Sequence, residues 1–140
     1  MKYSDFQSVE LLSGKEMYDE LSSSINADMQ TRLKYYNSRE GINELHFVVR
    51  AGEKIVAIAG IQENPYNPKQ LWSKHFSVDA EYRNLGLASK LIDSVFEYAL
   101  KNHYVLVRSS SSEMGTEYLK HVIEKAKRKY PTLEVIDSQT

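Results

Sequence analysis

Residues 76–89 read FSVDAEYRNLGLAS, and the pattern predicts the end of a strand, a short loop and a helix that begins at Gly86. The first N–H groups of a helix have no partners within the helix and attract anions. Small residues such as Gly86 and Ala88 would let an anion approach the backbone there. Arg83 adds a forked cation that suits pyrophosphate. The stretch therefore predicts a phosphate-binding site where a strand meets a helix.

Hydrophobic periodicity on both sides of this stretch predicts an α/β (α+β) fold, with a mixed central sheet and helices on both faces. The segment from residue 71 to residue 108 is expected to form a right-handed parallel strand–helix–strand crossover. The expected strands span 3–12, 45–50, 55–62, 71–78, 104–108 and 133–136, with a turn at 51–54 and a loop at 64–68. The expected helices span 14–24, 29–36, 86–101 and 114–130.

Length and composition indicate one ordinary globular domain. The 140 residues, 41% of them hydrophobic, suit a single domain over residues 1–140. A net charge of -1 gives no general attraction to nucleic acid or to an anionic membrane, so neither is expected as a partner. The sequence has no cysteine, which excludes disulfides, thiolate zinc sites and a cysteine nucleophile, and no metal is expected. No apolar run has the length of a signal peptide or of a membrane span, so the expected location is cytoplasmic.

The phosphate-binding stretch resembles the acetyl-CoA motif of the GNAT family of N-acetyltransferases. Arg83-x-x-Gly86-x-Ala88 matches the family pattern, and the preceding residues 78–83, VDAEYR, match its usual flank except that Ala80 replaces a proline. The resemblance covers about residues 44–120. It implies a GNAT fold that uses acetyl-CoA as cosubstrate and transfers the acetyl group when an amine attacks the thioester directly.

The resemblance also implies roles for individual residues. The backbone at Phe76 and Val78 would bind the pantetheine arm, in a place where this strand separates from its parallel neighbour. Tyr118 matches the tyrosine that protonates the leaving thiolate, and Ser111 stands where many members have asparagine. The implied cofactor-binding residues are Phe76, Val78, Arg83, Asn84, Leu85, Gly86, Leu87, Ala88, Ser89 and Ser111.

Each assignment has a simpler alternative. Gly86 could serve only a tight turn, and Arg83 could be an ordinary surface side chain. Tyr118 lies in the apolar stripe of its helix, so it could be a core residue. The serines at 109–112 could only cap that helix. The basic run 125–129, KAKRK, could attract nucleic acid or the adenosine phosphate of the cofactor, and it could equally be the solvated end of a helix.

The general base is not evident from the sequence. Many family members have a glutamate where this chain has Lys74, and a lysine cannot act as that carboxylate. His75 is the candidate catalytic base, because an imidazole titrates near neutral pH. Adjacent strand residues face opposite sides, so a bulge would decide whether Lys74 or His75 faces the site. Glu63 and His46 are weaker candidates.

The acceptor is expected to be an amine-bearing small molecule or protein. The missing carboxylate favours an α-amine, a weakly basic amine or deprotonation through water over a polyamine acceptor, because a lysine-like amine is harder to neutralise at pH 7. Two other functions remain open. The chain could be a non-catalytic acetyl-CoA-binding regulatory module of GNAT fold, or an interaction protein of similar architecture. A homodimer is also possible.

Overall fold

A six-stranded mixed sheet forms the centre of the computed structural model, which describes residues 9–22, 44–83, 85–109 and 116–138. Its strands lie in the order β1-β2-β3-β4-β5-β6. The first four pair antiparallel, and β4–β5 and β5–β6 pair parallel. The expected mixed sheet is therefore confirmed. The strands are β1 (Glu10–Ser13), β2 (Leu45–Ala51), β3 (Lys54–Glu63), β4 (Gln70–Val78), β5 (Val105–Ser109) and β6 (Val135–Ser138).

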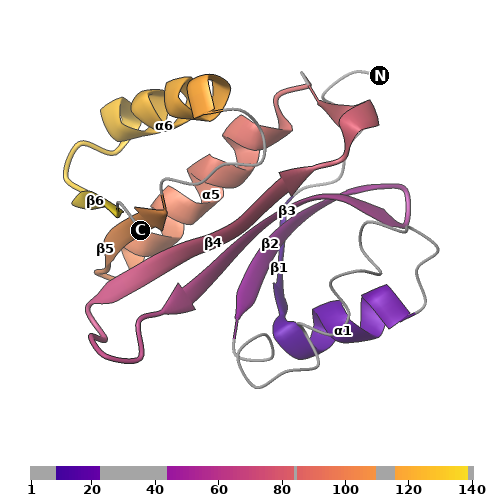
Figure 1. Ribbon diagram of the computed structural model, residues 1–140, viewed down its shortest axis with the longest axis horizontal. Helices are drawn as coiled ribbons and strands as arrows, with labels where there is room; N and C mark the ends of the chain where they lie inside the picture. The colour runs from indigo at the N-terminus through magenta and orange to yellow at the C-terminus, as the bar shows by residue number, and fades with distance from the viewer. Residues whose placement is uncertain (1–8, 23–43, 84, 110–115, 139–140) are drawn as a thin grey trace.

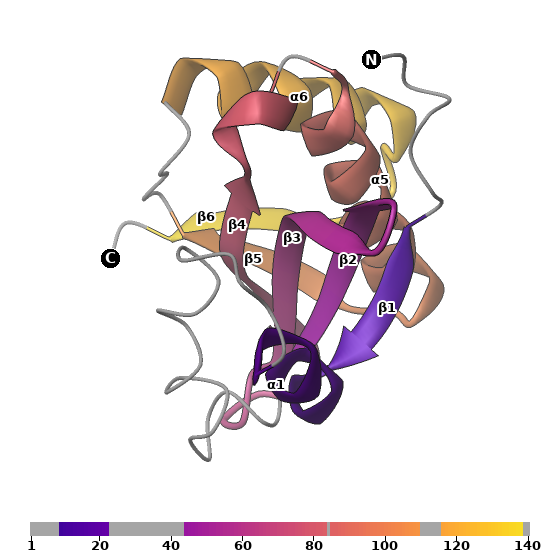
Figure 2. The same cartoon turned by 90° about the vertical axis from the view of Figure 1, so that its right-hand side faces the viewer.

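Helices cover both faces of this sheet, as the sequence predicts. The described helices are α1 (Gly14–Ser22), α5 (Leu87–Lys101) and α6 (Thr116–Lys129). Figure 1 shows α5 and α6 packed together against one face, and Figure 2 shows α1 on the opposite face. Because α5 has apolar residues at a spacing of four, it buries one continuous stripe against the sheet. That stripe is Leu87, Leu91, Val95 and Ala99, each at most 1% exposed.

The alternation of side chains along β2 and β3 divides the core into two parts. Phe47, Val49 and Ile61 join the main core under α5 and α6. Val48 and Ile58 are paired across the sheet and are also buried, yet they lie outside that cluster. Since successive strand residues face opposite sides, these two belong to the face that α1 covers.

The structure shifts several expected boundaries by one or two residues. The helix that precedes β5 ends with Tyr104 N donating to Ala99 O (2.8 Å), so the strand begins at Val105 instead of residue 104. The last strand begins at Val135 instead of residue 133, because Leu133 N still donates to Tyr130 O (3.2 Å) in the turn after α6. The expected helix at 29–36 and the beginning of the expected first strand, residues 3–8, lie outside the described residues.

The junction between β1 and α1 contains a capping box that the sequence analysis did not predict. Glu16 N donates to Ser13 Oγ (3.1 Å), and Ser13 N donates to Glu16 Oε1 (3.0 Å). These reciprocal bonds satisfy two backbone donors at the start of the helix. The backbone and side-chain bonds from Ser13 lower the pKa of Glu16, because they stabilise its carboxylate.

Candidate active site at the end of β4

The second half of β4 separates from β5. The parallel pairing runs only from Gln70↔Val105 to Ser73↔Arg108, although β4 continues to Val78. In the part of the chain that the structure describes, residues 74–78 of β4 therefore have no ladder partner on the β5 side. This leaves an open strand edge between β4 and β5, in the place where the sequence predicts one.

The backbone of Phe76 and Val78 is directed towards this open edge. Asp79 N donates to Val56 O at 2.8 Å, which places Asp79 in a hydrogen-bonded position of the β3–β4 ladder. Hydrogen-bonded and non-hydrogen-bonded residues alternate along an antiparallel pair. Phe76 and Val78, which pair with Ala59 and Ala57, thus point their N–H and C=O groups away from β3. These two residues are the ones to which the sequence assigns pantetheine binding.

A β-bulge interrupts β4 at the candidate base. Phe76 pairs with Ala59 and Lys74 pairs with Gly60, so His75 is the extra residue. The bulge considered in the sequence analysis is thus present, and it changes the alternation of side chains on its two sides. The side chains of Lys74 and His75 lie outside the described part of the structure, so the role of His75 as base stays a prediction.

A short loop, held in place by several side-chain and backbone contacts, connects β4 to α5. Residues Ala80–Tyr82 form one turn of 3-10 helix, with Tyr82 N donating to Asp79 O at 2.9 Å. Lys54 binds Asp79 (3.5 Å) and lies over the Tyr82 ring (5.8 Å), which fastens the loop to β3. Arg83 Nε donates to Val78 O at 3.1 Å. A guanidinium has five N–H donors, so this bond orients Arg83 beside the open edge and uses only one of them.

Gly86 caps α5 in a conformation that favours glycine. Its φ of 83° lies in the left-handed region, which costs other residues about 1–2 kcal/mol. Ser89 and Gly86 are partly exposed, and the first turn of α5 has no acidic residue that would repel an anion. Ala88 is only 3% exposed, so its small side chain packs in the core. The expectation that a small residue at this position lets a phosphate approach the backbone stays a prediction.

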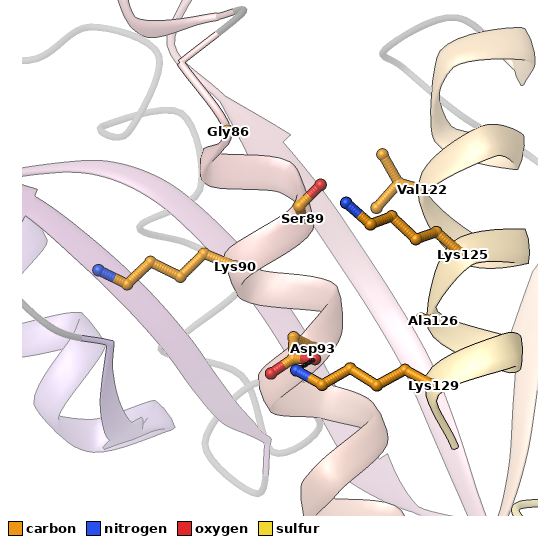
Figure 3. A pocket seen from close by; sticks show the side chains of 8 residues that line it. All are labelled: Gly86, Ser89, Lys90, Asp93, Val122, Lys125, Ala126 and Lys129. Carbon is orange, nitrogen blue, oxygen red and sulfur yellow. Dashed lines mark hydrogen bonds and ion pairs between the residues drawn. The ribbon is translucent and has the colours of Figure 1, made fainter. Parts of the chain in front are cut away.

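A groove of about 440 Å³ continues from Gly86 between α5 and α6. Figure 3 shows Ser89 and Lys125 directed into it from the two helices, with Asp93 and Lys129 one helical turn further along. Lys129 Nζ binds Asp93 Oδ1 at 2.7 Å, and Tyr130 Oη donates to the same oxygen at 3.1 Å. The sequence analysis did not identify this groove, because the α5–α6 packing that forms it is a tertiary contact.

The remaining predicted residues are only partly placed. Tyr118 is the third residue of α6, which begins at Thr116, but its side chain lies outside the described part. Asn84 and Ser111 lie outside the described residues altogether. Leu85 is partly exposed beside Gly86, and Leu87 is buried at 1% exposure, so Leu87 offers only its backbone.

The two weaker base candidates occupy very different places. Glu63 pairs with Leu71 near the start of β4, at the opposite end of that strand from Val78, and it accepts a hydrogen bond from Tyr104 Oη (3.0 Å). His46 is fully buried, and its Nε2 lies 3.2 Å from Oε2 of Glu44, which is also fully buried. The sequence analysis missed Glu44. Glu44 directly precedes β2 and lies two residues before His46, a spacing that in extended backbone places both side chains on one side and could have paired them.

The described residues show neither a membrane-spanning helix nor a cluster of metal ligands. Over the described ranges, no helix is long and apolar enough to cross a bilayer. Among the same residues, no group of three or more His, Cys, Asp or Glu side chains is arranged to hold a metal ion.

Comparison with known proteins agrees with this geometry. The model of the acetyltransferase (GNAT) family matches residues 14–114. N-acetyltransferase 8B of Rattus norvegicus is 28% identical over 129 residues, which are 87% of this chain and 57% of that protein, so the chain spans little more than half the relative's length.

Solved structures show the same fold. An aminoglycoside acetyltransferase from an uncultured soil metagenomic sample, in complex with trehalose, has a TM-score of 0.59 at 18% identity, covering 98% of this chain and 93% of that one. A predicted acetyltransferase from Clostridium acetobutylicum with acetyl-CoA has a TM-score of 0.54 at 12% identity, covering 92% and 90%. Together with the family match over most of the chain, the open edge of β4 and the glycine-capped helix that follows it show that this chain belongs to the GNAT acetyltransferase family.

Proposed function

We propose that this chain is an N-acetyltransferase that moves the acetyl group of acetyl-CoA to an amine acceptor. The observation that supports this most is the continuity of the site. The open edge at Phe76 and Val78 leads through Arg83 to the left-handed Gly86 and the first turn of α5. An extended thiol arm that ends in a pyrophosphate needs this order of groups, namely backbone partners followed by a cation and helix N–H groups.

The polar groups along this path match those of acetyl-CoA in kind and order. The backbone of Phe76 and Val78 would bind the pantetheine amides, because neither residue directs its polar groups towards β3. Arg83 and the N–H groups from Leu85 to Ser89 would bind the pyrophosphate. Acetyl-CoA supplies the activated thioester of the reaction. Tyr118, in the first turn of α6, is the proposed proton donor that converts the departing thiolate of coenzyme A to a thiol.

The acceptor is proposed to be an amine that is easily neutralised. Only a neutral amine can attack, and neutralising a lysine-like amine of pKa about 10.4 at pH 7 costs roughly 4–5 kcal/mol, against about 1 kcal/mol for an α-amino group. Glu63 is hydrogen-bonded to Tyr104 at the far end of β4, and Lys74 occupies the strand position of the family's glutamate. We therefore expect an α-amine or a weakly basic amine, with His75 as the proposed base. Turnover of spermidine at the same rate as such amines would contradict this.

Calorimetric titration with acetyl-CoA tests the binding site. In Gly86→Glu, a carboxylate would stand where the pyrophosphate binds. Like charges about 5 Å apart repel by roughly 3 kcal/mol at an effective dielectric constant of about 20, which corresponds to a loss of affinity of at least about 100-fold. The wild type is expected to bind at micromolar strength and the variant not measurably. If the wild type does not bind, the proposed function fails.

Gly52→Glu is the matched control. Gly52 also has a positive φ, 65°, and an added Cβ there would meet no atom within 4 Å. It lies in the β2–β3 turn, so the substitution introduces the same charge and similar backbone strain away from the open β4–β5 edge. Both variants should lose similar stability, and only Gly86→Glu should lose binding. Equal loss of binding in both would mean that strain, not occlusion, causes the effect.

Turnover distinguishes an enzyme from a sensor of acetyl-CoA. Tyr118→Phe is expected to lower kcat about 100-fold without changing the Kd for acetyl-CoA, because it removes only a proton donor. Thiol release with a panel of α-amines measures this. A protein that binds acetyl-CoA normally but acetylates no amine would instead be the regulatory module considered above.

A further inference from the structure

The α5–α6 groove is built from one face of each helix, and cations line it from α6. Ser89 and Asp93 line it from α5, one and two turns after Gly86, and Lys125 and Lys129 line it from α6. Asp93 binds Lys129, as described above. Among the described residues, Lys125 has no ion-pair or hydrogen-bond partner. In Figure 3 its ammonium group points across the groove towards Ser89.

We propose that Lys125 and Ser89 bind the 3′-phosphate on the adenosine end of coenzyme A. This proposal rests on the function proposed above and extends it to a residue of α6. The pyrophosphate would lie at the first turn of α5, and Ser89 is about 4.5 Å further along the helix axis than Gly86. A second phosphate group, attached to the same nucleotide, thus meets a hydroxyl donor and a cation. The volume of about 440 Å³ is within the range of roughly 300–1,000 Å³ that small-molecule sites occupy.

The charges in the groove favour a compact phosphate monoester. Such a group has a charge of about -1.5 to -2 at pH 7, and it attracts the ammonium group of Lys125. The Asp93–Lys129 pair closes the other end, because its two charges compensate each other and offer an anion no net attraction further along the groove. The site is therefore bounded by the helix start at Gly86 on one side and by the Asp93–Lys129 ion pair on the other.

The same arrangement argues against nucleic acid as the ligand of the basic run 125–129. Lys127 binds Glu124 (3.6 Å), and Lys129 is bound to Asp93, so the run does not present a continuous cationic surface. A polyanion with regularly spaced phosphates requires several cations along one face. The groove offers Lys125 for a single phosphate.

The test compares acetyl-CoA with acetyl-dephospho-CoA, which lacks only the 3′-phosphate, by calorimetry. For the wild type, we expect acetyl-dephospho-CoA to bind roughly three- to tenfold more weakly, the range for a partly exposed charge-assisted contact. The ratio of the two Kd values, acetyl-dephospho-CoA over acetyl-CoA, should fall to about one in Lys125→Ala. The variant loses affinity only for the ligand that carries the 3′-phosphate. Lys101→Ala is the control. It removes an exposed lysine from the last turn of α5, at the other end of the helix from Gly86, and should keep the wild-type ratio.

The possible outcomes separate this inference from the proposed function. If Lys125→Ala keeps the wild-type ratio, Lys125 does not contact the 3′-phosphate and the inference fails, while acetyl-CoA binding stands. If Lys125→Ala weakens both ligands equally, the inference also fails. If the wild type binds neither ligand, the proposed function itself is wrong. A charge reversal, Lys125→Glu, should bind acetyl-CoA more weakly than acetyl-dephospho-CoA, and the opposite order would contradict the inference.

Discussion

Replacing His46 by leucine should destabilise the fold by roughly 3–5 kcal/mol, the usual cost of removing the partner of a buried carboxylate. His46 and Glu44 are both 0% exposed, and Nε2 lies 3.2 Å from Oε2. Without the imidazole, the carboxyl of Glu44 has to remain buried.

Removing the other partner should cost less. In Glu44→Leu the remaining group is an imidazole, which can be buried without a charge. The cost is then about 1–2 kcal/mol, that of a lost buried hydrogen bond. The double variant, with leucine at both positions, should be more stable than the sum of the two single losses predicts, because neither polar group of the pair then has to be buried.

Urea unfolding at about pH 7 measures these differences. The loss in His46→Leu should exceed the loss in Glu44→Leu by about 2 kcal/mol, because a buried carboxylate costs more than a buried uncharged imidazole. Equal losses in the two single variants, or strictly additive losses in the double variant, would refute the reasoning.

Two further predictions concern groups with shifted pKa values. Burial and the hydrogen bond to Glu63 raise the pKa of Tyr104 to about 12 from 10.0, so its contribution to stability is complete below pH 10.0 and is lost as the pH rises through about 12. In Tyr104→Phe the free energy of unfolding, measured by urea titration, should therefore change less with pH above pH 10.0 than in wild type. An equally steep change would contradict this. Ser13→Ala should cost about 0.5–2 kcal/mol through loss of the helix cap. Because the folded pKa of Glu16 is lowered, the stability from this group exists above its ordinary value of 4.5 and is lost as the pH falls through the folded value. In thermal melts between about pH 7 and about pH 3, the Tm of Ser13→Ala should thus fall less with decreasing pH than the Tm of wild type.

Local patterns predicted most elements well. The hairpin of β2 and β3 follows from two apolar runs around a glycine-containing turn, and α5 follows from apolar residues at a spacing of four. The first residues of β5 and β6 were predicted one and two positions too early, because the ends of elements depend on particular hydrogen bonds. The bond from Tyr104 N to Ala99 O and the bond from Leu133 N to Tyr130 O each moved the start of a strand.

The sequence also located the candidate phosphate-binding turn, because Arg83 and Gly86 lie only three positions apart and form one local motif. It assigned the backbone of Phe76 and Val78 through a family resemblance, and the end of the β4–β5 pairing at Ser73 now gives that expectation a geometric basis. It did not indicate that the Ala88 side chain is buried, at 3% exposure. Ala88 continues the buried side of α5, and only the packing of the helix decides which of its faces is buried.

The sequence by itself determined the strand–loop–helix unit from β4 to α5 and the family to which the chain belongs, because both depend on residues within one short segment. The tertiary structure alone decided the open edge between β4 and β5, the burial of Glu44 with His46, and the groove that brings Lys125 of α6 to Ser89 of α5. Contacts between distant segments depend on register and helix packing. These are set by the whole core and leave no local pattern in the sequence.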